Sequence, residues 1–193
     1  LEGHFESEKY FEKYKDDIKK EFTLKNSYKI ENHPFYSKLN NKNSVSICLR
    51  QNRFIEGVGQ NTAENKTKSI NFVLEQINYI NKSAQIIKSK LSNPTFYLWS
   101  NDFKNIDKSK FNFHYEEINL EENNDIIDRR TTSLFLMKHC NHFIVTGSTF
   151  NWWGAWLSDK ESKIILRPSD NFFSDFYINN KDFWPLDWNI VNV

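Results

Sequence analysis

The stretch that decides the fold runs Cys140-Asn141-His142-Phe143-Ile144-Val145-Thr146-Gly147-Ser148-Thr149-Phe150-Asn151-Trp152-Trp153-Gly154-Ala155-Trp156-Leu157. Its apolar part, residues 142–146, predicts a buried strand, and the residues after Gly147 predict a helix. Ser148 and Thr149 suit the N-cap of that helix, whose first peptide N–H groups have no partner inside the helix and carry the positive end of its dipole. A phosphate can bind at such a helix start.

The three tryptophans of this stretch allow a second interpretation. Trp152, Trp153 and Trp156 have the spacing of one helix face that packs into a core, and Gly154 lets two elements approach closely. A packed helix face and an anion site at the helix start both remain open on these residues alone.

Strands and helices alternate on both sides of this stretch. Apolar residues at helical intervals predict helix over residues 70–91, as one helix or two, and shorter helices at 103–108 and 131–141. Strands are predicted at residues 44–49, 95–99, 111–115, 142–146 and 163–166. This alternation predicts an α/β fold, a Rossmann-like and mostly parallel sheet with helices on both faces.

The first part of the chain differs from the rest. Residues 1–43 read as an amino-terminal helix followed by a polar linker over 25–43, whereas the strand and helix pattern occupies residues 44–193. We therefore expect one Rossmann-like domain at 44–193, preceded by a segment from an interdomain region.

Composition excludes several classes of protein. The 193 residues suffice for one well-buried domain, and 26 Lys plus Arg against 25 Asp plus Glu argue against a general nucleic-acid binder. No apolar run approaches the ~18–20 residues of a membrane-spanning helix, and no signal peptide is evident. Cys48 and Cys140 lie in apolar contexts without the Cys/His spacing of a zinc site, so they are predicted to be buried free thiols.

Polar residues that follow the strands suggest a binding site. In an open α/β sheet, ligands bind beyond the carboxyl ends of the strands. Arg50 and Arg53 follow the strand at 44–49, Asp102 follows the strand at 95–99, and the helix start at Ser148 follows the strand at 142–146. A nucleotide diphosphate suits this set, because Arg pairs bidentately with phosphate oxygens and a carboxylate accepts from a purine or ribose donor.

Residues 140–157 closely resemble the signature of bacterial alpha-1,2-fucosyltransferases, glycosyltransferase family 11, in which a Cys-x-His run leads into Ser-Ser/Thr-Phe-Ser-Trp-Trp-Gly-Ala-Trp-Leu. Residues 3–11 are similar to the family's Gly-Tyr-Phe/Trp-Gln-Ser-Glu-Lys-Tyr-Phe, residues 96–102 to its Phe-Tyr-Ile-Phe-Ser-Asp-Asp, and residues 184–188 to its closing Pro-x-x-Trp. The family's Gly-Gly-Leu-Gly-Asn-Gln-Met-Phe motif is absent. The resemblance therefore implies the carboxyl-terminal, donor-binding half of a GT-B type glycosyltransferase.

Two segments depart from the family pattern. The donor motif His-x-Arg-Arg-Gly-Asp-Tyr appears as Cys48-Leu49-Arg50-Gln51-Asn52-Arg53-Phe54, so only its first Arg is matched in place. Arg53 stands where the motif has Asp and restores a second positive charge. Ser133 stands where the family has Asp, four residues before a Met. The sequence does not identify a general base.

The resemblance implies an inverting transferase that moves L-fucose from GDP-fucose to the 2-hydroxyl of a galactose-like acceptor, for bacterial surface glycans. The expected partners are thus a nucleotide-sugar donor and a glycan acceptor, and no nucleic acid. Arg50 is the expected catalytic residue, because it would stabilise charge that develops on the leaving pyrophosphate. The expected donor-binding residues are Arg50, Arg53, Asp102, Ser148, Thr149 and Phe150.

The same resemblance sets the remaining expectations. No metal and no cofactor are expected, since the sequence has no Asp-x-Asp and the donor is itself a substrate. The expected location is the cytoplasm, either free or peripheral at the cytoplasmic face of the bacterial inner membrane. Two alternatives stay open, a transferase that uses another GDP-sugar and a non-catalytic nucleotide- or sugar-binding domain.

Overall fold

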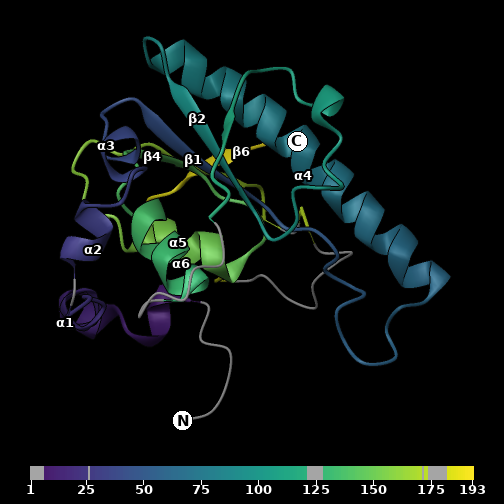
Figure 1. Ribbon diagram of the computed structural model, residues 1–193, viewed down its shortest axis with the longest axis horizontal. Helices are drawn as coiled ribbons and strands as arrows, with labels where there is room; N and C mark the ends of the chain where they lie inside the picture. The colour runs from purple at the N-terminus through teal and green to yellow at the C-terminus, as the bar shows by residue number, and fades with distance from the viewer. Residues whose placement is uncertain (1–6, 26, 121–127, 171, 174–181) are drawn as a thin grey trace.

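The computed structural model describes residues 7–25, 27–120, 128–170, 172–173 and 182–193, and contains a six-stranded sheet (Figure 1). Every neighbouring pair of strands is parallel, in the order β3-β2-β1-β4-β5-β6. This is the strand order of Rossmann-type sheets. The strands are β1 (Ser44–Leu49), β2 (Thr95–Ser100), β3 (Glu116–Glu117), β4 (His142–Ile144), β5 (Ile165–Pro168) and β6 (Asn189–Val191).

Helices cover both faces of the sheet, as the sequence predicts (Figure 1). The long helix α4 packs on one face, against alternate β1 residues Val45, Ile47 and Leu49. Cys48 points to the other face and joins the core beneath α5 and α6. This alternation follows from the two-residue period of a strand. The α-helices are α1 (Lys15–Glu21), α2 (Tyr28–Glu31), α3 (Tyr36–Leu39), α4 (Ala63–Lys90), α5 (Arg129–Met137) and α6 (Thr149–Trp156).

The region left open as one helix or two is a single helix of 28 residues, α4. The Thr62 hydroxyl caps its start by accepting from the Asn65 N–H. No Gly or Pro interrupts residues 63–90, and the helix ends just before Asn93, whose φ of 55° is left-handed. A stripe along α4 is completely buried against the sheet and fixes the position of the helix; it includes Phe72, Gln76, Ile80, Ala84 and Ile87.

Several sequence predictions differ from the structure. The linker over residues 25–43 contains α2 and α3, whose Ile30 and Leu39 are buried in the core beneath α5 and α6. A 3-10 turn at Lys108–Lys110 replaces the helix expected at 103–108. The strand expected at 111–115 is displaced to Glu116–Glu117, because Phe111, Phe113 and Tyr115 pack against one another instead. Strand β6 was not predicted.

The helix expected near the start of the chain is broken. Two 3-10 turns, Glu8–Tyr10 and Glu12–Tyr14, precede the short α1. The segment before β1 is hard to interpret from sequence because Pro34 separates Ile30 from the short apolar group Phe35, Tyr36 and Leu39, and neither part is long enough to show a helical period. The division into a segment at 1–43 and a domain at 44–193 stays a prediction.

Aromatic residues of α6 form the centre of one core. Trp152 is 1% exposed, its ring stacks on Trp156 with centroids 6.0 Å apart, and its Nε1 donates to the Phe183 carbonyl at 2.8 Å. Trp188 lies 5.7 Å from Trp152. The interpretation of a packed helix face is thus confirmed for Trp152 and Trp156, while Trp153 is only half-buried.

Gly154 lets α6 approach α5 closely. A Cβ at this position would lie 2.4 Å from Met137 Sδ and 3.0 Å from Met137 Cγ, and Met137 is completely buried. We expect Gly154→Ala to destabilise the protein, because overpacking costs about 1–3 kcal/mol and exceeds the helix-propensity gain of about 1 kcal/mol. Urea unfolding measures the change.

Met137→Ala supplies the control for this prediction. In that background the clash is removed, so Gly154→Ala should be neutral or stabilising. Equal effects of Gly154→Ala in both backgrounds would contradict the close contact.

Candidate functional site

The strand order reverses between β1 and β4, and ligands of open α/β sheets bind at this point beyond the carboxyl ends of the strands. The Thr146 hydroxyl, just after β4, donates to the Cys48 carbonyl of β1 at 2.8 Å. Arg50 lies two residues beyond Cys48, and Ser148 lies two residues beyond Thr146. The structure therefore brings the predicted Arg and the predicted helix start to one edge, on neighbouring strands.

A buried amide holds the backbone of Arg50. Gln76, completely buried on α4, accepts from the Arg50 N–H at 3.1 Å and donates to the Arg50 carbonyl at 3.0 Å. A side-chain amide can make both bonds because it carries a donor and an acceptor. Gln76 therefore holds the main chain of Arg50 in place, whichever way the Arg50 side chain points.

The guanidinium of Arg50 forms an ion pair with Glu56, a residue that the sequence analysis missed. Both side chains are partly exposed, 31% for Arg50 and 41% for Glu56. Asn101 Nδ2 lies 3.5 Å from the other carboxylate oxygen of Glu56. Arg50 thus already binds an anionic group at this edge. No sequence spacing marks Glu56, because it lies in a glycine-containing loop outside the motif.

The ends of β1 and β2 are linked by side-chain amides. Asn101 accepts from the Gln51 N–H at 2.8 Å and donates to the Gln51 carbonyl at 3.1 Å. The buried Gln51 side chain donates to the Asp102 carbonyl at 2.9 Å. These bonds give partners to backbone N–H and C=O groups where the chain leaves the sheet. They hold the two loops together in the absence of a ligand.

The Asp102 carboxylate makes its hydrogen bonds within its own loop. It accepts from the Lys104 N–H and from Asn105 Nδ2, both at 2.9 Å. Both oxygens therefore shape their own loop, as Asp often does in turns. Arg53 is exposed in the turn that follows Asn52, whose φ is 57°. The structure places both residues at the carboxyl edge.

Helix α6 begins as the sequence predicts, with Ser148 in the extended N-cap conformation at φ −132° and ψ 125°. Its hydroxyl makes no capping bond, and its N–H donates to the Thr146 carbonyl at 2.7 Å. In the free protein this N–H is engaged within its own turn, and the expectation that Ser148 binds the donor stays a prediction. Thr149 and Phe150 carry the next two N–H groups, for which the described part of the chain provides no partner.

Asn151 is a further residue that sequence reasoning missed. It is completely buried, and its Oδ1 accepts from the Thr146 N–H at 2.9 Å, while its Nδ2 lies 3.8 Å from Met137 Sδ. Asn151 thus ties the loop after β4 to the first turn of α6, and this bond orients the helix start toward the edge.

The two cysteines and His142 are buried in the fold and take no part in the candidate site. Cys48 and Cys140 are buried free thiols, as predicted, and burial raises the pKa of the Cys48 thiol to about 12. His142 is 2% exposed; its Nδ1 accepts from the Ile164 N–H at 3.0 Å, and its Nε2 lies 2.9 Å from the Lys42 carbonyl. Burial lowers the pKa of His142, so the neutral form that these bonds require is favoured.

Within the part of the chain that the structure describes, no group of three or more His, Cys, Asp or Glu side chains is arranged to hold a metal ion. None of the helices described is long and apolar enough to span a membrane.

Comparison with known proteins identifies the family. Residues 1–192 match the model of glycosyl transferase family 11, and the chain therefore belongs to that family. It is 25% identical over 189 residues to an alpha-1,2-colitosyltransferase of Escherichia coli, covering 96% of this chain and 60% of that protein. It is also 37% identical over 65 residues to the Escherichia coli O-antigen biosynthesis glycosyltransferase WbnK, covering 34% of this chain and 20% of that protein. No solved structure matches.

Proposed function

We propose that this chain binds a GDP-sugar at the carboxyl edge of its sheet and belongs to an inverting transferase that moves L-fucose to the 2-hydroxyl of a galactose-like acceptor in bacterial surface glycan synthesis. The pyrophosphate lies between the Arg50 guanidinium and the start of α6. Membership of the family over nearly the full chain supports the reaction class. In the GT-B arrangement that the sequence resemblance implies, this sheet is the donor half.

The observation that carries this proposal is the pairing of Arg50 with the α6 start at the strand-order reversal. Arg50 supplies a planar cation that suits phosphate oxygens, and the N–H groups of Thr149 and Phe150 lie at the positive end of a helix dipole. Charge grows on the leaving GDP as the glycosidic bond breaks, so both groups stabilise the transition state more than the ground state. Arg53 adds positive charge nearby.

A second donor sugar also has specific support. The relative that covers 96% of this chain is named for transfer of colitose. Colitose is fucose without its 3-hydroxyl, so the two donors share the nucleotide, the pyrophosphate and most of the sugar. The phosphate contacts proposed here serve either donor equally.

Calorimetric titration with GDP, UDP, GDP-fucose, GDP-mannose and GDP-colitose tests the function, together with turnover on galactosides. We expect binding of GDP and of one 6-deoxy GDP-sugar, and transfer from that sugar with inversion. Binding of GDP-mannose alone would indicate another GDP-sugar transferase. A protein that binds galactosides and ignores every nucleotide would be a lectin, and this result would overturn the proposal.

Glu56 leads to a separate prediction, because it is the anion that Arg50 binds in the free protein. Glu56→Gln removes that negative charge and keeps the shape, so GDP no longer competes with a carboxylate. We expect the GDP dissociation constant to fall several-fold, in line with about 0.5–1 kcal/mol for a partly exposed ion pair.

Calorimetry on Glu56→Gln and on Glu64→Gln, an exposed glutamate of α4, provides the comparison. Weaker GDP binding by Glu56→Gln would show that Glu56 positions Arg50 rather than competing with the ligand. Turnover by the Glu56→Gln variant tests a different role. A large loss of turnover together with tight GDP binding would identify Glu56 as a proton acceptor.

A further inference from the structure

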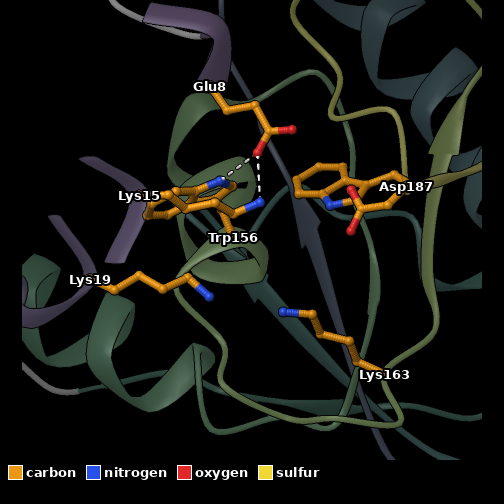
Figure 2. A pocket seen from close by; sticks show the side chains of 7 residues that line it. Glu8, Lys15, Lys19, Trp156, Lys163 and Asp187 are labelled. Carbon is orange, nitrogen blue, oxygen red and sulfur yellow. Dashed lines mark hydrogen bonds and ion pairs between the residues drawn. The ribbon is translucent and has the colours of Figure 1, made fainter. Parts of the chain in front are cut away.

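Figure 2 shows a pocket of about 200 Å³ that is lined by residues from α1, the end of α6 and the segments before β5 and β6. It lies at the amino edge of the sheet, whereas Arg50 follows the carboxyl end of β1. Helix α6, which begins at the carboxyl edge, ends here at Trp156, and strands β5 and β6 begin just after Lys163 and Trp188. This position separates the pocket from the proposed donor site by the length of a helix and a strand. The lining residues are Glu8, Lys15, Lys19, Trp156, Lys163, Asp187 and Trp188.

Two lysines from distant parts of the chain point into this pocket. Figure 2 shows the ammonium groups of Lys19, from α1, and Lys163, from the segment before β5, directed toward the same space. The Nζ of Lys163 donates to the Ser158 carbonyl at 2.5 Å, and within the described residues no carboxylate lies within 4.0 Å of it. Lys19 forms an ion pair with Asp159 at 3.7 Å, whose side chain is 75% exposed, and its Nζ lies 5.4 Å from the centroid of the Trp156 ring.

The carboxylates of the pocket do not neutralise these two lysines. Glu8 forms an ion pair with Lys15 at 3.1 Å and accepts from Trp156 Nε1 at the same distance. Asp187 is exposed at the rim. Burial lowers the pKa of Lys163, and the charges of Lys19 and Lys15 lower it further, against the opposing effect of Asp187 and Asp159. Three lysines and two carboxylates line the pocket, so its lining carries one positive charge in excess.

We propose that this pocket binds a single phosphoryl group, held between the ammonium groups of Lys19 and Lys163. A tetrahedral oxyanion accepts from both ammonium groups at once, and such charge-assisted bonds are about twice as strong as neutral ones. The volume accommodates one phosphoryl group with part of the molecule that carries it. Glu8 and Asp187 border the same space and repel additional negative charge, which favours one phosphoryl group over a polyanion.

Inorganic phosphate is the probe for the first test, with binding measured by calorimetry on the whole chain. We expect Lys19→Met and Lys163→Met each to weaken phosphate binding tenfold or more. Lys90→Met, an exposed lysine in the last turn of α4, should bind as the parent does. Among the described residues, the Nζ of Lys19 donates no hydrogen bond to a backbone carbonyl, unlike that of Lys163, so the Lys19 variant tests the site even if Lys163→Met fails to fold.

A second variant separates this pocket from the donor site. Arg50→Ala should leave phosphate binding unchanged, whereas it should weaken GDP binding; conversely, Lys163→Met should leave GDP binding unchanged. The proposal is overturned if Lys19→Met binds phosphate like the parent, or if Arg50→Ala alone removes phosphate binding.

Vesicles distinguish the source of the phosphoryl group. Co-sedimentation with phosphatidylcholine vesicles that contain phosphatidic acid, lost in Lys19→Met and retained in Lys90→Met, would identify a lipid headgroup. Phosphate binding without such co-sedimentation would identify a soluble phosphorylated molecule. Either result supports the pocket, and co-sedimentation that is equal for both variants, with no phosphate binding in solution, contradicts it.

Discussion

Arg50→Ala is expected to lower sugar transfer about 10²–10³-fold, the usual effect of removing one group that stabilises transition-state charge, while the protein remains folded. The fold should survive because Gln76 bonds the backbone of Arg50, and alanine retains that backbone. The guanidinium itself is 31% exposed and contributes to no core. Steady-state turnover and GDP titration on the folded variant measure the effect.

Arg50→Lys provides the matched control for this variant. Lysine keeps the charge and loses the planar, bidentate geometry, so we expect intermediate activity and partial GDP affinity. Near-normal turnover by a folded Arg50→Ala protein would remove Arg50 from the mechanism. A melting temperature far below that of the parent would instead show a structural role that the Gln76 bonds do not explain.

Trp152→Ala is expected to cost about 3–5 kcal/mol of unfolding free energy, the usual range for truncating a buried aromatic side chain. A domain of this size is stable by about 5–15 kcal/mol in total, so the variant should be marginal or unfolded. Trp152 is 1% exposed, and the mutation also leaves the Phe183 carbonyl without its donor. Urea unfolding measures the loss.

Trp153→Ala is the comparison, because Trp153 is the neighbouring indole and only half-buried. It stacks on Phe11 and Phe22, with centroids 5.7 and 5.2 Å away. Its truncation should cost clearly less than that of Trp152. Equal losses in the two variants would contradict the view that α6 presents Trp152 to the core and Trp153 to its margin.

The sequence predicts the parts of this fold that have a regular period. Strand β1 has an alternating apolar pattern and lies at its predicted bounds. Helix α4 has a helical apolar pattern and ends one residue from its predicted end, but it begins at Ala63, seven residues before the predicted start. Strand β6 escaped prediction because only Val191 among its three residues is buried. Three residues contain too little of a two-residue period to be distinguished from a loop.

The sequence predicts where the candidate site lies in the fold, but it does not predict the side-chain contacts around Arg50 and the start of α6. Residues that follow strands meet at one edge by topology alone, which is why Arg50 and the α6 start could be placed together. Glu56, Gln76 and Asn151 act through single long-range or loop contacts, and no spacing in the sequence reports such contacts. The hydrogen bond from the Ser148 N–H to the Thr146 carbonyl likewise depends on a local turn that no spacing in the sequence reports.

The central claim is that a nucleotide pyrophosphate lies at the start of α6, and Thr149→Pro tests it by removing one N–H at that place. Proline is favoured at the first position of a helix. The preceding residue, Ser148, already has the extended conformation that a following proline requires. The fold should therefore tolerate this change, and Thr149→Ala, which keeps the N–H and loses the hydroxyl, is its control.

The decisive measurement is the GDP dissociation constant of Thr149→Pro, determined by calorimetry beside its melting temperature. A hydrogen bond to a charged group contributes about 1.5–3 kcal/mol, so we predict binding at least about tenfold weaker than in the parent. Thr149→Ala should bind GDP normally, and both variants should melt close to the parent. Unchanged GDP affinity in a folded Thr149→Pro protein would contradict the account, because the pyrophosphate would then lie elsewhere.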